Sequence, residues 1–325
     1  MNRVIAVFLL ILIAFVLIPY LMTLGIDSYS QPQDMNDINI EEIPSIKVYT
    51  SDNKETDIPL DEYLCGAVAF QMPLNYEDEA IKAQSICIYT YYLYKLKNNT
   101  PDEKHPSCPV CADSSHCRGY RSKEELKTEL GEAKFNKEYP RLQNLIRQVL
   151  YEAILFDSEP INAVFHAISS GRTESAADVW GQDIQYLRSV DSNVDTSARD
   201  YLTTVIIPAE TFKNKFKNAN DKMNFSSNAD SWIEDILLTD AGGIKSVRVG
   251  GVLISGNEFR KTLSLRSTNI VYILEDNEFT FNIKGYGHCV GLSQYGANKY
   301  AEQGMKYSDI LKKYYSGVEI KQVKP

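Results

Sequence analysis

Two histidines and two cysteines lie within thirteen residues, at His105, Cys111, His116 and Cys117. Two nitrogens and two sulfurs are the ligand set that zinc takes in closed, tetrahedral structural sites, and Cys108 is an alternative sulfur ligand. A disulfide among Cys108, Cys111 and Cys117 is the competing interpretation, because six cysteines in an exported chain can pair. The histidines favour zinc, since a disulfide has no use for imidazole. Such a site would hold a loop in place without reacting itself.

A second segment combines small hydroxyl residues, a carboxylate and one of the two tryptophans of the chain. Sugar binding uses flat aromatic faces against C–H groups, and hydroxyl or carboxylate partners for the sugar's OH groups. A buried tryptophan beside an ordinary turn is the alternative. The candidate sugar-binding residues are Ser169, Ser170, Gly171, Thr173, Glu174 and Trp180.

A third segment, residues 285–297, carries four glycines and a histidine. Glycine lets the backbone approach a partner closely or adopt positive φ, although such runs also form plain turns. The segment is not a phosphate-binding loop, because no Lys-Ser or Lys-Thr pair follows it. The candidate residues here are His288, Gly291, Ser293, Gln294 and Tyr295.

The composition excludes one class of partner. A net charge of −9 and a pI of about 5.1, with no basic stripe, argue against nucleic acid, whose phosphates require clustered Lys and Arg. The length of 325 residues and the 44% hydrophobic content suit a sizeable packed core.

The amino-terminal stretch is apolar. Val4 to Ile26 is uncharged and long enough to span a bilayer, and no convincing small-x-small cleavage site follows it. Arg3 and the amino terminus are the nearby positive charges, so the rest of the chain should lie outside the cell. We therefore expect a single uncleaved membrane anchor over residues 1–26, a polar flexible linker over 27–44 and one extracytoplasmic domain over 45–325.

The elements that must position these residues are predicted by their periodicity. Apolar residues from Leu60 recur at helical spacing as far as Gln71, and Pro73 ends the pattern. A second helix is predicted from Glu77 to about Lys95, and the charged segment before Arg147 should be an exposed helix. Gln71 therefore lies at the turn between two packed helices.

The second half of the chain is predicted to be richer in sheet. Residues 164–190 and 247–286 alternate β-branched and polar residues, 218–230 should be a loop, and helices are expected over 296–304 and 308–315, the latter capped by Ser308. Together with the earlier helices this predicts an α+β fold: one mixed helix and sheet ectodomain with a substrate groove.

Four ordered blocks of the sequence resemble the stage II sporulation protein D family, which also occurs as the amidase-enhancer domain. The blocks are Ala67-Val68-Ala69-Phe70-Gln71-Met72-Pro73; Glu79-Ala80-Ile81-Lys82-Ala83-Gln84 with Thr90-Tyr91; Ser170-Gly171-Arg172-Thr173-Glu174 through Val179-Trp180-Gly181; and Gly287-His288 through Gly291 with Ser293-Gln294-Tyr295-Gly296-Ala297. The resemblance spans roughly Ile46 to Gln322.

The resemblance implies a lytic transglycosylase, which cuts peptidoglycan glycan strands without water and leaves an anhydro sugar. In the family one glutamate protonates the glycosidic oxygen and later takes a proton from the sugar's own hydroxyl. Gln71 stands at that position. An amide cannot exchange a proton at neutral pH, so strongly impaired catalysis is expected.

The resemblance also implies a structural zinc, because zinc-bearing members of the family place His, Cys and a His-Cys pair after the second helix. His105, Cys111, His116 and Cys117 have that kind of spacing. Two other positions depart from the family pattern: Tyr89, where Arg is usual, and Cys289, where Gly is usual.

Gln71 has three interpretations. It is a natural loss that leaves a glycan-binding scaffold, an engineered acid-to-amide change, or a site whose acid is now Glu77, Asp78, Glu79 or Glu174.

We expect a sporulation-associated protein that binds peptidoglycan glycan strands at the cell membrane during engulfment, with a companion wall hydrolase or amidase as partner. The alternatives are an active lytic transglycosylase and a non-enzymatic activator of an amidase.

Overall fold

The computed structural model describes residues 43–98, 103–114 and 116–325. The predicted anchor and nearly all of the predicted linker therefore lie outside the described residues. Residues from Pro44 to Pro325 form one compact unit. Within the described part of the chain, no helix combines the length and the apolar character needed to cross a membrane.

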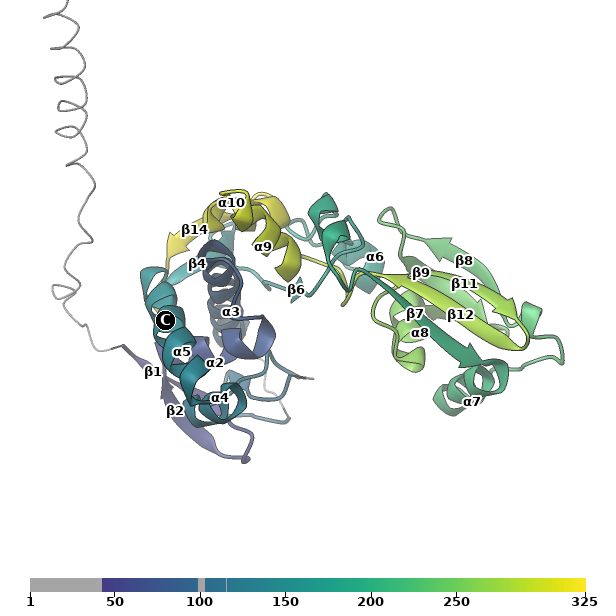
Figure 1. Ribbon diagram of the computed structural model, residues 1–325, viewed down its shortest axis with the longest axis horizontal. Coiled ribbons are helices and arrows are strands. Elements are labelled where there is room, and N and C mark those ends of the chain that lie inside the picture. Colours follow the sequence, from purple (N-terminus) through teal and green to yellow (C-terminus); the bar gives the residue numbers. More distant parts are fainter. Residues whose placement is uncertain (1–42, 99–102, 115) are drawn as a thin grey trace, which may run out of the picture. The chain divides into compact units, whose positions relative to one another are not determined.

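The amino-terminal half of this unit is built on helices α2 (Leu60–Gln71), α3 (Asp78–Asn98) and α5 (Glu132–Gln148), which lie together in Figure 1. The two predicted helices on either side of the Gln71 turn are confirmed. Met72 caps α2 through its backbone N–H, and Pro73 cannot continue the helix. The turn is thus fixed by the packing of two largely buried helices.

The charged segment before Arg147 differs from the prediction. It forms two helices, α4 (Lys123–Leu130) and α5, because Gly131 separates them with φ +76°. Ser122 and Glu125 form a capping box at the start of α4. The α5 helix also buries an apolar face against α2 and α3, so it is not simply a solvated helix.

Short strands surround the helices. β1 (Ser45–Tyr49) pairs antiparallel with β2 (Glu55–Pro59) and parallel with β3 (Val110–Cys111). β4 (Glu152–Phe156) lies between β5 (Glu159–Pro160) and the carboxy-terminal β14 (Glu319–Gln322). β6 (Phe165–His166) pairs in parallel with β13 (Leu292–Ser293). This last pair joins two of the candidate segments.

The prediction of sheet over 164–190 is largely wrong. Besides β6, that region contains the short helix α6 (Ala176–Trp180), capped by Ser175, and irregular backbone; the 3₁₀ helix η1 (Asn193–Ser197) follows it. Hydroxyl residues of this region, such as Ser169 and Ser189, bond across loops rather than along a ladder.

A second core lies in the sheet-rich part. β12 (Glu278–Lys284) runs between β11 (Asn269–Glu275) and β7 (Leu202–Pro208), and β9 (Ile244–Val249) runs between β8 (Ile233–Leu238) and β10 (Val252–Ser255). Helices α7 (Ala209–Ala219) and α8 (Gly256–Leu263) pack on these strands (Figure 1). Phe212 stacks on Phe279 at the centre of this core, with ring centroids 4.5 Å apart.

The strands predicted over 247–286 are confirmed in part, since α8 interrupts them. Ser255 caps this helix by accepting a hydrogen bond from Glu258 N. The predicted loop over 218–230 connects α7 to β8, with the 3₁₀ turn η2 (Ala229–Ser231) at its end.

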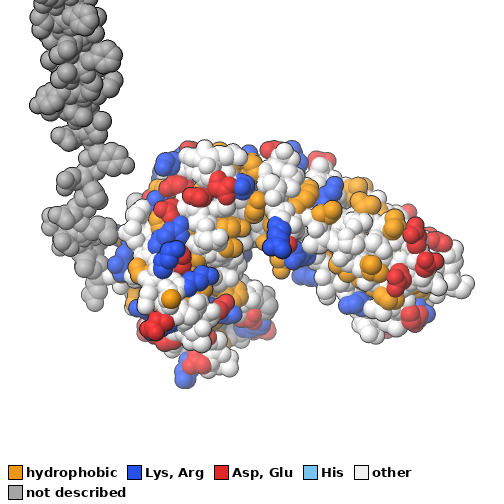
Figure 2. Space-filling model, viewed as in Figure 1, with side chains coloured by type: hydrophobic (Ala, Val, Ile, Leu, Met, Phe, Trp, Pro, Cys, Tyr) orange, Lys and Arg blue, Asp and Glu red, His pale blue; other side chains and the backbone are white. Residues whose placement is uncertain are grey.

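The two closing helices are α9 (Gln294–Glu302) and α10 (Tyr307–Tyr314), both packed on α3. Ser293 caps α9 through Gly296 N. Ser308 is not a cap, because α10 begins at Tyr307 after Lys306. Helices and several small sheets confirm the predicted mixture. On the face shown in Figure 2, acidic and basic side chains are interspersed over the helical part rather than segregated by sign.

Candidate functional site

Gln71 is the last residue of α2, and both of its polar ends are held. Its side-chain Nε2 donates to the backbone carbonyl of Arg118. Its own backbone carbonyl accepts a hydrogen bond of 3.0 Å from Gln294 Nε2. The structure thus brings together the Gln71 turn and the Gln294 segment, which lie 223 residues apart in sequence.

Gln294 also links this position to the second helix. Its Nε2 lies 3.3 Å from Oε1 of Gln84, whose side chain is fully buried on α3. Gln84 Nε2 has no hydrogen-bond partner among the described residues. The Gln294 side chain therefore joins the backbone at the end of α2 to the Gln84 side chain on α3.

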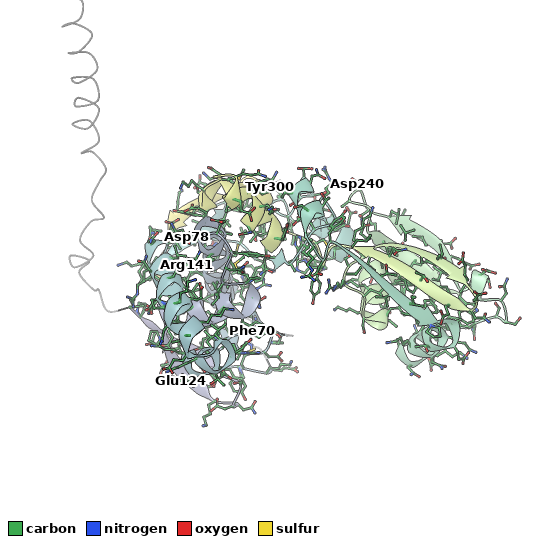
Figure 3. All side chains as sticks on the ribbon, viewed as in Figure 1. Phe70, Asp78, Glu124, Arg141, Asp240 and Tyr300 are labelled. Carbon is green, nitrogen blue, oxygen red and sulfur yellow. The ribbon has the colours of Figure 1, made fainter. Side chains whose placement is uncertain are left out.

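Arg141 on α5 fixes the turn that follows Gln71. Its guanidinium donates to the carbonyls of Leu74 at 2.7 Å and Tyr76 at 2.9 Å, and its Nε donates to Asp78 Oδ1 at 3.0 Å. Figure 3 shows Arg141 and Asp78 side by side on neighbouring helices. One planar group with several donors thus locks backbone and side chain of the same turn.

The acidic residues near this turn are already engaged or face solvent. Glu77 is exposed and Asp78 is bound by Arg141. Glu79 accepts hydrogen bonds from Tyr307 N at 2.9 Å and Lys82 Nζ at 3.1 Å. Partial burial opposes these bonds, but together they hold the pKa of Glu79 below its usual value. A low pKa does not suit a general acid at neutral pH.

Glu174 faces a different loop. It is buried, and its Oε1 accepts from Thr239 Oγ1 at 3.0 Å, close to Gly243. Burial raises its pKa, and its Oε2 has no partner among the described residues. Gln71 instead contacts Arg118 and Gln294, so the structure does not bring Glu174 into that group of contacts.

The glycine-rich segment brings a histidine to the tryptophan. The ring centroids of His288 and Trp180 are 5.4 Å apart, and Trp180 remains 37% exposed. Gly291 has φ +73°, and a side chain there would meet the carbonyl of Val164. The close approach of the two segments therefore requires glycine at this position.

His166 is a site residue that the sequence analysis missed. It lies on β6, with its ring centroid 5.9 Å from that of His288. Its Nδ1 donates to the Val290 carbonyl at 3.1 Å, which leaves Nε2 as a buried acceptor with no partner among the residues that the structure describes. Burial lowers the pKa of His166 to about 4, so the imidazole is neutral at physiological pH. The available signal was that the chain has four histidines, and the other three were already candidates.

Asp195 is a second residue that the sequence analysis missed. Its buried carboxylate accepts hydrogen bonds from Ser169 Oγ at 2.5 Å, Ser192 Oγ at 2.7 Å and Ser293 Oγ at 2.7 Å. Ser169 and Ser293 were expected to contact substrate, but their hydroxyls are committed to Asp195. Their observed role is to join two of the candidate segments.

The candidate sugar-binding residues fall into two groups. Ser169, Thr173, Glu174, Gly291, Ser293 and Gln294 are buried, whereas Ser170, Gly171, Trp180, His288 and Tyr295 keep accessible surface, as Gln71 does. Only the residues of the second group have surface with which they could contact a ligand directly. The buried residues of the first group hold the backbone that carries the second group.

The two departures from the family pattern have separate explanations. Tyr89 is buried, and its hydroxyl donates to the Val323 carbonyl at 2.6 Å, so it secures the carboxy terminus. Cys289 is buried with φ +59°, a left-handed conformation that glycine adopts without strain. A glycine at position 289 would adopt this conformation without strain.

His105, Cys111, His116 and Cys117 converge in the loop after α3, and one ligand atom from each lies within 4.8 Å of the others. The distances are 3.2 Å between His105 Nε2 and His116 Nδ1, 3.3 Å between Cys117 Sγ and His105 Nε2, and 3.6 Å from His116 Nδ1 to each sulfur. Tetrahedral zinc places two nitrogens about 3.4 Å apart and nitrogen about 3.6 Å from sulfur. The spacing therefore fits a tetrahedral metal site.

The surroundings of this cluster also fit a metal. His105 Nδ1 donates to the Cys108 carbonyl at 2.7 Å, which turns Nε2 toward the other ligands. Cys108 lies outside the cluster, and all six cysteines, each of them described, are free thiols. Arg118 follows Cys117 directly, so the cluster adjoins the residue that holds the Gln71 amide.

Known proteins share sequence with the segments that form this site. A family model described as stage II sporulation protein matches residues 49–153. Stage II sporulation protein D of Bacillus amyloliquefaciens is 31% identical over 280 residues, which cover 86% of this chain and 79% of that protein. The chain belongs to the stage II sporulation protein D family. The resemblance seen in the sequence is confirmed.

Other relatives extend the likeness. Stage II sporulation protein D of Bacillus subtilis is 30% identical over 279 residues, covering 86% of this chain and 79% of that protein. A protein named amidase enhancer, also from Bacillus subtilis, is 23% identical over 305 residues, covering 79% of this chain and 40% of that protein. This member of the stage II sporulation protein D family therefore shares its domain with a protein named for its effect on an amidase.

Proposed function

We propose that this protein binds the glycan strands of peptidoglycan during sporulation and that it cuts them poorly or not at all. The observation that carries the proposal is the Gln71 side chain at the end of α2, an amide that donates to the Arg118 carbonyl, while the Gln71 backbone carbonyl accepts from Gln294. It stands where the family's catalytic glutamate is expected. The amide retains hydrogen-bonding capacity but cannot supply the proton that the leaving sugar needs.

The accessible residues near this position suit a sugar. Trp180 offers an aromatic face beside His288, and the Ser170, Gly171 and Tyr295 positions offer polar groups at the same junction of segments. Asp195 and Arg141 hold the supporting loops, so these contacts are preorganised. Binding to a preorganised surface loses less conformational entropy.

We further propose that His105, Cys111, His116 and Cys117 hold a structural zinc. Four protein ligands leave no open position, so the metal would stabilise the loop that carries Arg118. The protein would act outside the cell membrane on an amino-terminal anchor, with peptidoglycan and a companion wall hydrolase or amidase as partners.

A second candidate function is the activation of a separate amidase. The similarity to the protein named amidase enhancer favours it. Catalysis by another carboxylate has less support, because Asp78 and Glu79 are engaged and Glu174 faces Thr239.

The test incubates the purified full-length protein with insoluble peptidoglycan whose stem peptides have been removed. Sedimentation measures binding, and mass spectrometry of the supernatant measures anhydro-sugar products. The proposal expects co-sedimentation with little or no product, and a Trp180→Ala variant that sediments less. A Trp232→Ala variant, which removes the buried tryptophan of the second core, is the control for general loss of folding. Rapid release of anhydro sugars would contradict the proposal, and so would absence of co-sedimentation.

A further inference from the structure

The sheet formed by β7, β12 and β11, which lie side by side in Figure 1, has an apolar outer face. Alternate residues of a strand point to the same side, and Phe281 of β12 is among those buried on the core side. Four large apolar side chains on the other side are between 49% and 63% exposed: Leu202, Ile206, Val271 and Ile273. Apolar patches of this kind usually mark a contact with another molecule.

The strand register arranges the residues of this outer face in four rows that cross the sheet from β7 through β12 to β11. The rows are Leu202–Lys284–Asn269, Thr204–Asn282–Val271, Ile206–Thr280–Ile273 and Pro208–Glu278–Glu275. The Thr204 hydroxyl donates to Asn282 Oδ1 at 2.8 Å, so polar groups in the middle of the face already bond to each other. The first row carries a cation and the fourth row carries two anions.

The charges at the two ends of the face have no partner within the sheet. Lys284, Glu275 and Glu278 are exposed and form no ion pair with any of the residues that the structure describes. The first and fourth rows are six residues apart along β12, or about 20 Å, so Lys284 cannot reach Glu278 of the same chain. Partners for these charges must come from another molecule.

A second copy of the face supplies these partners when its strands run in the opposite direction. A two-fold axis that lies in the interface plane, perpendicular to the strands, places the first row of each copy against the fourth row of the other. Lys284 then faces Glu278 of the second copy, and this contact occurs twice in the dimer. An axis along the strands would instead bring Lys284 against Lys284, which like charges oppose.

The same reversal matches the apolar side chains. Val271 in the second row faces Ile273 in the third row, and Leu202 in the first row faces Pro208 in the fourth. Three strands about 4.8 Å apart, with residues about 3.3 Å apart along them, make a face of roughly 14 by 23 Å. Two such faces bury on the order of 1,000 Å² together, which is near the lower limit for a specific interface and suits a reversible dimer.

We propose that the outer face of the β7–β12–β11 sheet joins two copies of this chain in a symmetric, reversible dimer whose facing strands run antiparallel. Lys284 and Glu278 set the orientation, and the exposed apolar side chains supply contact area. The proposal is independent of glycan binding, because none of the face residues belongs to the candidate site. Its consequence is a particle that carries two candidate sites.

The first experiment is sedimentation velocity of the full-length protein in a non-ionic detergent over a range of protein concentrations. The unchanged protein should pass from monomer to dimer as the concentration rises. Lys284→Glu and Glu278→Lys should each weaken the association by about ten-fold or more, because each variant places like charges at two symmetric contacts. Lys217→Glu makes the same charge change on α7, which covers the inner face of the sheet, and should leave the association unchanged.

The second experiment mixes the two charge-reversed chains, each with a different affinity tag. The Lys284→Glu chain has an acid at both ends of β12, and the Glu278→Lys chain has a base at both ends. Each should therefore co-purify with the other but not with a differently tagged copy of itself, and this recovery also shows that both chains are folded. The apolar amino-terminal stretch is the same in every chain, so it does not contribute to these differences.

Three results would overturn the proposal. The first is an unchanged protein that stays monomeric, which would assign the face to a different partner. The second is a pair of single variants that associate with themselves as strongly as the unchanged protein does. The third is a mixture of the two variants that fails to recover the association, because Lys284 would then not face Glu278 of a second copy.

Discussion

Under the proposed function, replacing Gln71 by glutamate should give the site a proton donor. In the structure the Gln71 amide donates to the Arg118 carbonyl. A protonated carboxyl group can make the same bond, but an ionised one places two oxygens against each other. The bond is worth about 1 kcal/mol net, so the pKa of the introduced group should rise by about one unit above the usual value of about 4.3.

A raised pKa favours the acid form that protonates a leaving sugar. General acid and base assistance contributes about 10² to 10⁴-fold in rate, so Gln71→Glu should release anhydro sugars at least about a hundred-fold faster than the unchanged protein. The rate should fall as pH rises well above the pKa of the introduced group. The assay follows anhydro-sugar products from stripped glycan strands by mass spectrometry between pH 4.5 and 8.

Two variants serve as controls for this prediction. Gln71→Ala should release no more product than the unchanged protein. Asn75→Glu adds a carboxylate to the exposed part of the same turn and should also give no gain. If Gln71→Glu binds strands but yields no additional product, position 71 is not the vacated acid position and the reasoning is refuted.

Three further predictions concern the supporting structure. Metal analysis should find about one zinc ion per chain, lost in Cys111→Ser but retained in Cys108→Ser, and equal metal content in both variants would contradict the assigned ligands. The pKa of His166 is about 4 in the folded protein and 6.5 when the side chain is exposed, so the unfolded chain binds more protons between these two pH values. The unfolding free energy measured by urea denaturation should therefore fall by about 3 kcal/mol as pH is lowered from 6.5 to 4. The His166→Gln variant should show a smaller loss. Asp195→Ala leaves three hydroxyls without their acceptor and should lower the unfolding free energy by about 3 kcal/mol in urea, against at most about 0.5 kcal/mol for Asp183→Ala, which breaks an exposed pair; similar values for both would refute the role of Asp195.

The sequence predicted the parts of the site that depend on local patterns. Helical periodicity up to Gln71 and the following Pro73 located the turn, and the residue types from His105 to Cys117 located the cluster. These signals act within one element or one loop. The mixture of helices and strands was predicted for the same reason.

The residues that the sequence did not predict, Asp195 and His166, make their contacts with residues that are distant in the chain. Asp195 lies in a short 3₁₀ turn without periodicity, and its role depends on serines 26 and 98 residues away. His166 becomes part of the site through the pairing of β6 with β13, each only two residues long. Strands this short leave no alternating pattern. The prediction of sheet over 164–190 was wrong because its hydroxyl residues bond to loops and to a buried carboxylate.

The most direct test of the central claim is a crystal structure of the protein with a stripped glycan tetrasaccharide. The account predicts a sugar ring beside Trp180, with an intact glycosidic oxygen within about 3 Å of the Gln71 amide. A saccharide bound elsewhere on the molecule, or one cleaved at residue 71, would contradict it.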